Sequence, residues 1–170
     1  MSDKVHFVIT GGTIDSYYEG TKDTAVPLKE SSIPNLFNLI KPYNDVVFTQ
    51  VCMKDSRDLD KNDMKQVLDV IEKSKQKKII VTHGTYTMPD TARYLEANLK
   101  RKDQVIILTG SIIPISGFSP SDGPFNLGFA FAKLFDLKPG IYVSMNARIF
   151  SPKEVIKVSK EGKFSSIIGE

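Results

Sequence analysis

The sequence predicts an α/β fold in which a mostly parallel sheet carries helices on both faces. Short apolar runs with the length of strands recur along the chain, and the segments between several of them change to helical periodicity. The connections between these segments are short. Strands that alternate with helices through short connections are typical of parallel sheets, because the crossover helices pack on the faces of the sheet.

The strands are expected where apolar residues run together and then stop at glycine or polar residues. Such runs are rich in Val and Ile, which suit a buried strand. The five ranges are Val5–Ile9, Val46–Met53, Lys78–Thr82, Gln104–Thr109 and Gly140–Met145.

The helices are expected where apolar residues return every three or four positions. In the first, four apolar residues from Met64 to Ile71 follow the i, i+3, i+4, i+7 pattern, and Asp60 or Asn62 is placed to cap the N-terminus. Two further helices are marked by a proline that suits the first helical turn or lies just beyond the last turn. These two are Pro89–Lys100 and Phe125–Leu137.

Two segments do not follow the alternation, and the C-terminal tail is a separate case. Ile14–Lys29 is polar and has no sustained period, so it is interpreted as a mobile loop of the kind that forms lids. Ile113–Pro124 carries three prolines and two glycines, which indicates a fixed irregular connection. Phe164–Ile168 is expected to add an edge strand.

Size and composition favour a single domain over residues 1–170. The chain is 41% hydrophobic, and its 23 basic and 20 acidic residues leave a net charge of +3, which is too small and too dispersed for a nucleic-acid-binding surface. No run reaches membrane-spanning length, and the N-terminus lacks the pattern of a signal peptide. Cys52 is a single cysteine and is expected to pack in the core. A reducing cytoplasm is the expected location.

Hydroxyl-bearing turns follow three of the predicted strands. They are Thr10–Thr13, Thr82–Thr87 and Thr109–Ser111, and each contains glycine. Because parallel strands end at the same edge of a sheet, we expect these turns to lie close together and to form a polar ligand site. The alternative is that the first turn is an ordinary loop with glycines where the backbone needs them.

Thr13 and Thr85 are the candidate nucleophiles of such a site. A threonine hydroxyl is weakly nucleophilic until a base takes its proton. His83 is one candidate base, although it also suits a structural role in which its ring bonds to the backbone. A buried lysine with a lowered pKa is the other candidate.

Together these motifs resemble the bacterial-type asparaginases, which are amidohydrolases with threonine nucleophiles. Thr10–Ile14 is similar to the first family signature, and Thr82–Met88 is similar to the second except at one position. Asp55–Asp58 and Asp122–Leu127 resemble two further family segments, and Lys157 stands where the family has its catalytic lysine. The matches follow the family order over nearly the whole chain.

The resemblance implies the asparaginase N-terminal domain, whose layers are like those of flavodoxin or Rossmann folds. Family members are usually about twice as long, because a second domain follows, and a neighbouring subunit often lends residues to the site. This chain is similar to the short single-domain members, and we expect no cofactor and no metal. A homodimer is expected because a second copy would cover an exposed edge of the pocket.

The resemblance assigns catalytic roles to the matching positions of this sequence. The resemblance implies that Thr13 attacks the amide carbon and forms an acyl-enzyme. Tyr18, or alternatively Tyr17, would approach the Thr13 hydroxyl when the loop closes. Thr85 and Lys157 would form a polarising pair that activates the nucleophile or the water.

Substrate contacts are carried over in the same way. Ser56 would hold the substrate carboxylate. Gly12, Thr85 and Ser111 would supply backbone or hydroxyl contacts around the amide, including part of an oxyanion hole.

Tyr86 is the departure from the family pattern. The family normally has an aspartate there, which contacts the α-ammonium of the substrate, and a neutral phenol does not replace that charge. Asp15, Asp55, Asp58 or a neighbouring subunit could supply a carboxylate instead. Alternatively, the tyrosine ring packs away from the pocket.

These observations predict hydrolysis of L-asparagine, or of a related small amide, to the acid and ammonia. The alternative is a catalytically weakened or inactive relative that binds an amino acid or amide. A phosphate-binding loop is a weaker third hypothesis, because the sequence lacks both glycine-rich phosphate motifs.

Overall fold

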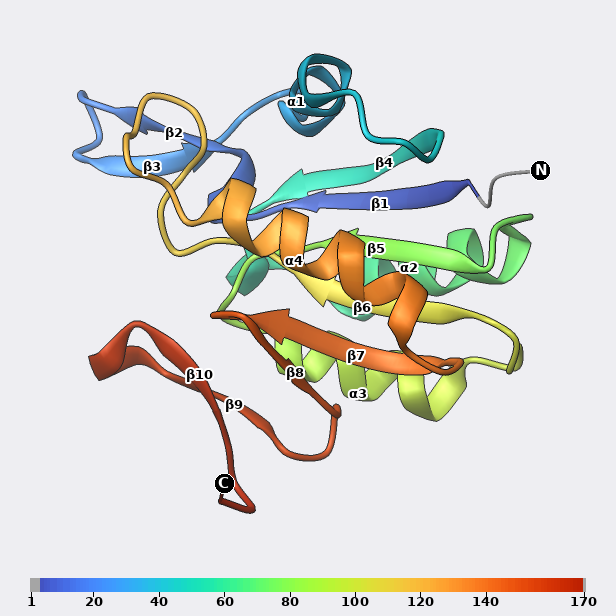
Figure 1. Ribbon diagram of the computed structural model, residues 1–170. Helices are drawn as coiled ribbons and strands as arrows, with labels where there is room; N and C mark the ends of the chain where they lie inside the picture. Colours follow the sequence, from blue (N-terminus) through green and yellow to red (C-terminus); the bar gives the residue numbers. More distant parts are fainter. Residues whose placement is uncertain (1–3, 170) are drawn as a thin grey trace.

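The structure is a computed structural model that describes residues 4–169. A six-stranded sheet forms its centre (Figure 1). Its strand order is β4-β1-β5-β6-β7-β8. All neighbours pair in parallel except β7 and β8. The bounds are β1 Val5–Gly11, β4 Val46–Lys54, β5 Lys78–Thr82, β6 Val105–Thr109, β7 Gly140–Met145 and β8 Arg148–Phe150. The predicted α/β class and its five strands are confirmed.

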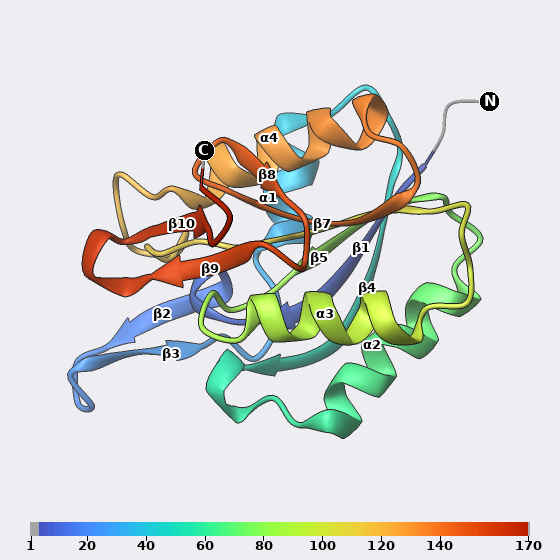
Figure 2. The same ribbon diagram turned by 90° about the horizontal axis from the view of Figure 1, so that it is seen from below.

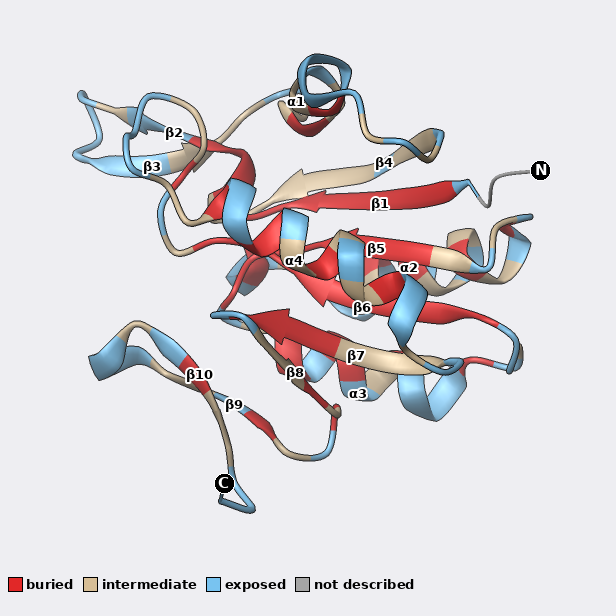
Figure 3. Ribbon diagram, viewed as in Figure 1, coloured by how far each residue is buried: buried red, intermediate tan, exposed pale blue. Residues whose placement is uncertain are grey.

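Helices cover both faces of this sheet (Figure 2). They are α1 Ile33–Ile40, α2 Lys61–Lys73, α3 Met88–Asn98 and α4 Gly123–Asp136. Alternate residues of a strand point to opposite faces, so Val8 packs with α2 and α3 whereas Phe7 packs with α1 and α4. The strands β1, β5 and β6 are buried along most of their length (Figure 3). This double cover explains why these strands are apolar throughout.

Helix α2 begins with a capping box. The Asp60 side chain accepts a hydrogen bond from the Asp63 backbone N–H at 2.9 Å, and the Asp63 side chain accepts one from the Asp60 backbone N–H at 3.0 Å. Of the two predicted caps, Asp60 is therefore the one used. The same Asp63 carboxylate also binds Lys54 at 2.8 Å.

Asp60→Ala is expected to lower the free energy of unfolding by about 1 kcal/mol, because an N–H group at the start of α2 loses its partner. Urea unfolding at neutral pH measures the change. Asp69→Ala, a substitution within the same helix away from its end, is the control and is expected to change stability less. An equal loss in both variants would contradict the assignment of the cap.

Two hairpins and one helix differ from the prediction. Ile14–Lys29 was expected to be a loop, but it contains an antiparallel hairpin of β2 Ser16–Glu19 and β3 Thr24–Pro27. The expected edge strand near the C-terminus is instead β10 Lys163–Ser166, which pairs with β9 Val155–Val158 in a separate two-stranded sheet. Helix α1 was not predicted. All three elements are short, so their sequence periodicity is weak.

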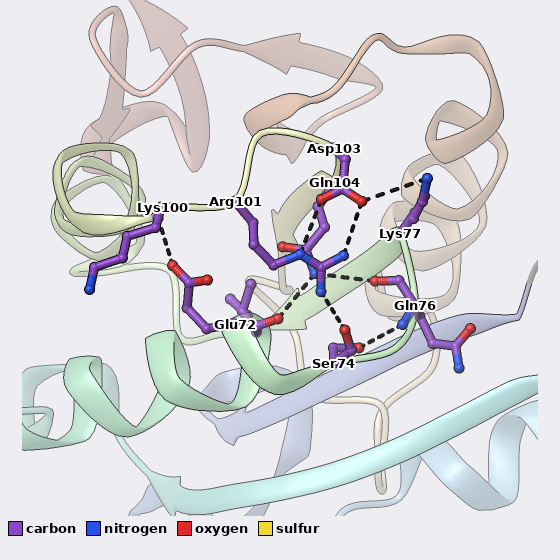
Figure 4. A network of polar contacts seen from close by, with 9 residues as sticks. Glu72, Ser74, Gln76, Lys77, Lys100, Arg101, Asp103 and Gln104 are labelled. Atoms are coloured by element: carbon purple, nitrogen blue, oxygen red, sulfur yellow. Dashed lines mark hydrogen bonds and ion pairs between the residues drawn. The ribbon is translucent and has the colours of Figure 1, made fainter.

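A polar network fixes the N-terminal ends of the central strands (Figure 4). Arg101 donates to the carbonyl of Ser74 and pairs with Asp103, and Gln104 donates to the carbonyl of Gln76 at 3.2 Å. The network joins the end of α2 to the segments that lead into β5 and β6. It therefore holds the strands at the end opposite to the polar turns.

Candidate active site

A cavity of about 190 Å³ lies at the carboxyl ends of the parallel strands. The turns after β1, β4 and β5 contribute to its wall, and β9 supplies one further residue from near the C-terminus. Its lining residues are Thr13, Asp55, Ser56, Arg57, Gly84, Thr85, Tyr86 and Lys157. The two threonine turns and the lysine, which are far apart in the sequence, therefore meet at one cavity.

Close backbone contact between glycines allows the turns to converge. Gly12 has a φ of +84°, and a Cβ built on it would lie 2.3 Å from the Gly84 backbone. A Cβ built on Gly84 would lie 2.6 Å from the Cβ of Ser56. The backbone N–H of Gly12 donates to the carbonyl of Lys54 at 2.8 Å. Both positions need glycine, because Gly12 lies against the Gly84 backbone and Gly84 lies against the side chain and backbone of Ser56.

Lys157 contacts Thr85 directly. Its Nζ donates to Thr85 Oγ1 at 2.8 Å, and Thr85 is only 4% exposed. Burial, followed by the nearby positive charge of Arg57, lowers the pKa of Lys157, although Asp55 acts in the opposite direction. A lysine of this kind loses its proton more readily and is suited to accept a proton through a hydroxyl.

The hairpin of β9 and β10 places Lys157. Phe164, its partner across the hairpin, and Val155 on the same strand are buried in the core beside α3. Arg93 of α3 donates to the carbonyl of Val155 at 2.8 Å. The backbone N–H of Phe164 donates to Asn146 at 2.9 Å. The position of Lys157 is thus set by contacts with α3 and with the end of β7.

Ser56 and Asp55 lie where β4 ends. Ser56 is 2% exposed, its Oγ accepts the Tyr86 backbone N–H at 3.2 Å, and Thr87 donates to its carbonyl at 2.7 Å. The side chain of Arg57 binds both oxygens of Asp55, at 3.0 Å and 2.8 Å. This hydrogen-bonded pair lowers the pKa of Asp55. Arg57 is a site residue that the sequence analysis missed, and its place beside Ser56 was the available signal.

Tyr86 does not pack away from the cavity. Its ring is part of the cavity wall, yet the residue is 60% exposed. The ring centroid lies 5.1 Å from Lys157 Nζ and 5.7 Å from Arg57 Cζ, so both cations make contact with the aromatic ring.

Three of the predicted site residues are turned elsewhere. Tyr18 is 52% exposed and its hydroxyl donates to Asp23, while the Tyr17 hydroxyl donates to Glu19 at 3.1 Å. Both tyrosines are thus bonded within the β2–β3 hairpin. Ser111 is fully buried and donates to the carbonyl of Ile113 at 2.7 Å. The catalytic and binding roles of these residues stay predictions.

His83 has the structural environment that the sequence analysis gave as its alternative to a base. Its Nδ1 donates to the carbonyl of Gly84 at 2.7 Å, and Thr91 Oγ1 lies 2.8 Å from Nε2. The side chain is 1% exposed, and burial lowers its pKa to about 4. The ring holds the turn after β5 against α3.

Because His83 titrates near pH 6.5 when unfolded and near pH 4 when folded, only the unfolded chain takes up this proton between those values. We therefore expect the free energy of unfolding to fall by about 3 kcal/mol as the pH drops from 6.5 to 4. Urea unfolding across this range measures it. His83→Gln should flatten this pH dependence more than His6→Gln does, and an unchanged slope in His83→Gln would contradict the assignment.

The fold and this cavity define the class of protein. The crystal structure of a probable cytoplasmic L-asparaginase from Campylobacter jejuni superposes with a TM-score of 0.83 at 27% identity, over 96% of this chain and 53% of that one. The thermostable L-asparaginase from Thermococcus kodakarensis gives 0.82 at 26% identity, over 96% and 51%. The architecture is therefore that of asparaginase-type amidohydrolases.

The family model described as Asparaginase, N-terminal matches residues 4–166, and the chain belongs to the asparaginase family. Glutaminase-asparaginase of Acinetobacter glutaminasificans is 30% identical over 166 residues, covering 91% of this chain and 50% of that protein. L-asparaginase 2 of Escherichia coli (strain K12) is 27% identical over 163 residues, covering 91% and 46%. The chain spans about half the length of the curated relatives it matches.

Two features are absent from residues 4–169. Among the helices of this range, none combines the length and the apolar character that a bilayer crossing requires. Within the same range, no group of three or more His, Cys, Asp or Glu side chains is arranged to hold a metal ion.

Proposed function

We propose that this chain is an amidohydrolase that converts L-asparagine, or a related small amide, to the acid and ammonia. The observation that carries the proposal is the 2.8 Å contact between Lys157 Nζ and Thr85 Oγ1 at a cavity that Thr13 also lines. A hydroxyl nucleophile needs a nearby base, and this arrangement supplies one through a second hydroxyl.

In the proposed reaction, Thr13 Oγ1 bonds to the amide carbon and its proton passes to the departing nitrogen. The carbon–nitrogen bond breaks, ammonia leaves, and an ester joins the acyl group to Thr13. Water then adds to the ester, the acid is released, and Thr13 regains a proton. The Thr85–Lys157 pair accepts and returns the proton in each half of the reaction.

The other proposed site residues hold the substrate. Ser56, buried beside the cavity, is assigned to the carboxylate, and Gly12 and Ser111 to the surroundings of the amide. Tyr18 approaches Thr13 if the hairpin that carries it folds over the cavity. The β2–β3 hairpin lies beyond the carboxyl ends of the parallel strands (Figures 1 and 2), where residues of the turns also line the cavity, which supports this assignment.

The domain organisation, oligomeric state and cellular location are also proposed. We place all catalytic residues in one domain spanning residues 1–170, acting as a homodimer in the cytoplasm. The domain assignment is supported by the two apolar clusters that share one central sheet.

Ammonia release from the purified protein tests the proposed function. Asparagine, glutamine and acyl amides without an amino group are the substrates, and each is compared with the Thr13→Ala variant. We expect release with at least one amide, and release roughly 10⁴-fold or more slower from the variant. No release with any amide, from protein that unfolds cooperatively, would overturn the proposal.

The lowered pKa of Lys157 gives a prediction about pH. If neutral Lys157 is the base, the rate rises with pH until this lysine has lost its proton. Arg57→Gln removes a repelling charge and frees Asp55, and both changes raise the pKa of Lys157. We expect the rising limb of kcat to move to higher pH in this variant. A limb that stays in place would show that another group is the base.

A further inference from the structure

Among residues 4–169 of one chain, no free carboxylate lines the cavity. Asp55 is the single acidic residue among its lining residues, and both of its oxygens are bound by Arg57, with a further bond from the Arg57 backbone N–H at 2.9 Å. Of the other acids considered above, Asp15 is buried and accepts three hydrogen bonds from Ser31 and Ser32. Asp58 does not line the cavity.

Positive charge, by contrast, is in excess. Arg57 and Lys157 both line the cavity and both lie within 6 Å of the Tyr86 ring centroid, at 5.7 Å and 5.1 Å. An ammonium group that entered beside Tyr86 would meet the Arg57 guanidinium, a second cation while Lys157 holds its proton, and only a carboxylate that is already paired. Like charges placed together disfavour binding unless a counter-ion compensates.

Donors for an anion remain available. Among the bonds of residues 4–169, Arg57 uses Nε and Nη2 on Asp55 and leaves Nη1 without a protein acceptor. Its side chain is 66% exposed, so a ligand can reach this nitrogen. The hydroxyl of Ser56 also lies at the cavity and can donate to a carboxylate. An anionic group is therefore matched where an ammonium is not.

We propose that the substrate carries a carboxylate and a primary amide but no charged amino group. This inference rests on the proposed function and names its substrate class. Two kinds of compound share this chemistry: a monoamide of a dicarboxylic acid, such as succinamate, and an asparagine whose α-nitrogen is acylated and therefore neutral.

A second cavity bears on the choice between these two. It has a volume of about 310 Å³, and Tyr86 and Lys157 line both cavities. Its other lining residues are Pro89, Asp90, Arg93, Val155, Ile156 and Ser159. Asp90 is paired with Arg93 at 3.2 Å, so this cavity also holds a carboxylate that is already paired. It offers room beyond Tyr86 for an acyl substituent.

The test compares kcat/KM for ammonia release from succinamate, N-acetyl-L-asparagine and L-asparagine. Succinamate and asparagine differ only in the α-ammonium group. We expect at least one of the first two to exceed asparagine by about tenfold or more, since one unpaired charge is worth at least that factor. Preference for succinamate alone identifies the unsubstituted amide, and preference for N-acetyl-L-asparagine identifies the acylated amino acid.

Tyr86→Asp replaces the ring by a second carboxylate beside Arg57 and Lys157, which offsets the excess positive charge. It is expected to raise kcat/KM for asparagine relative to succinamate by about tenfold, while Lys160→Gln, which removes an exposed positive charge outside the cavity, leaves the ratio unchanged. Should Tyr86→Asp not fold, thermal stabilisation of the unaltered protein by succinate and by L-aspartate is compared instead. Greater stabilisation by succinate supports the inference.

Failure of the proposed substrate class and failure of the proposed function give different results. Ammonia release from asparagine that equals or exceeds release from both other amides overturns the substrate class but leaves the hydrolase standing. Absence of release from all three removes the proposed function itself. Equal stabilisation by succinate and L-aspartate also overturns the substrate class.

Discussion

Thr13→Ala is expected to lower kcat/KM for ammonia release by roughly 10⁴-fold or more, the scale typical of losing a nucleophile. The substitution removes the oxygen that forms the acyl-enzyme but leaves the neighbouring glycine contacts in place. Substrate binding should change little, because the cavity keeps Ser56, Arg57 and Lys157. Initial rates of ammonia formation, measured with the best amide substrate, give the loss.

Thr21→Ala is the matched control, because Thr21 is an exposed threonine whose hydroxyl bonds to Glu19 at the end of the β2–β3 hairpin. This control should retain nearly full activity. Thr13→Ser keeps a hydroxyl and should recover part of the lost rate. If Thr13→Ala stayed within tenfold of the unaltered protein, Thr13 would not be the nucleophile, and Thr85 would take its place as the candidate.

Lys157→Met is expected to lower kcat by about 10²–10⁴-fold, the range typical of general-base catalysis. The methionine keeps much of the side-chain volume beside Thr85 but accepts no proton. Lys157 acts through Thr85. The double variant Thr85→Val/Lys157→Met should therefore be about as active as the less active of the two single variants.

Lys160→Met controls for removal of a lysine from the same part of the chain, since Lys160 is exposed and lies outside the cavity. It should leave kcat unchanged. Fully multiplicative losses in the double variant would contradict the account, because they would mean that Thr85 and Lys157 act independently.

The convergence of the two threonine turns was predictable from the sequence for a physical reason. Parallel strands end at one edge of a sheet, so turns that follow β1 and β5 must lie near each other. The glycine at position 12 is explained by the same contact, because the turns approach too closely for a side chain. The apolar strands and the three longer helices were predictable because their periodicity extends over several turns or strand positions.

Other parts of the site depended on contacts that local sequence does not encode. Lys157 was found only through the resemblance, since nothing near it distinguishes it from the other basic residues. Its place depends on Phe164 and on Arg93, which bonds to the β9 backbone 62 positions away. The pairing of Arg57 with Asp55, and the contact of both cations with Tyr86, likewise appear only in three dimensions.

The central claim is spatial: one small molecule reaches Thr13 and Thr85 together, with Lys157 behind the second threonine. A crystal structure with the acid product bound tests it most directly. We expect the carboxyl carbon that derives from the amide to lie about 3–3.5 Å from Thr13 Oγ1 and the Thr85–Lys157 contact to persist. A product bound away from Thr13, or a Lys157 that has left Thr85, would contradict the account.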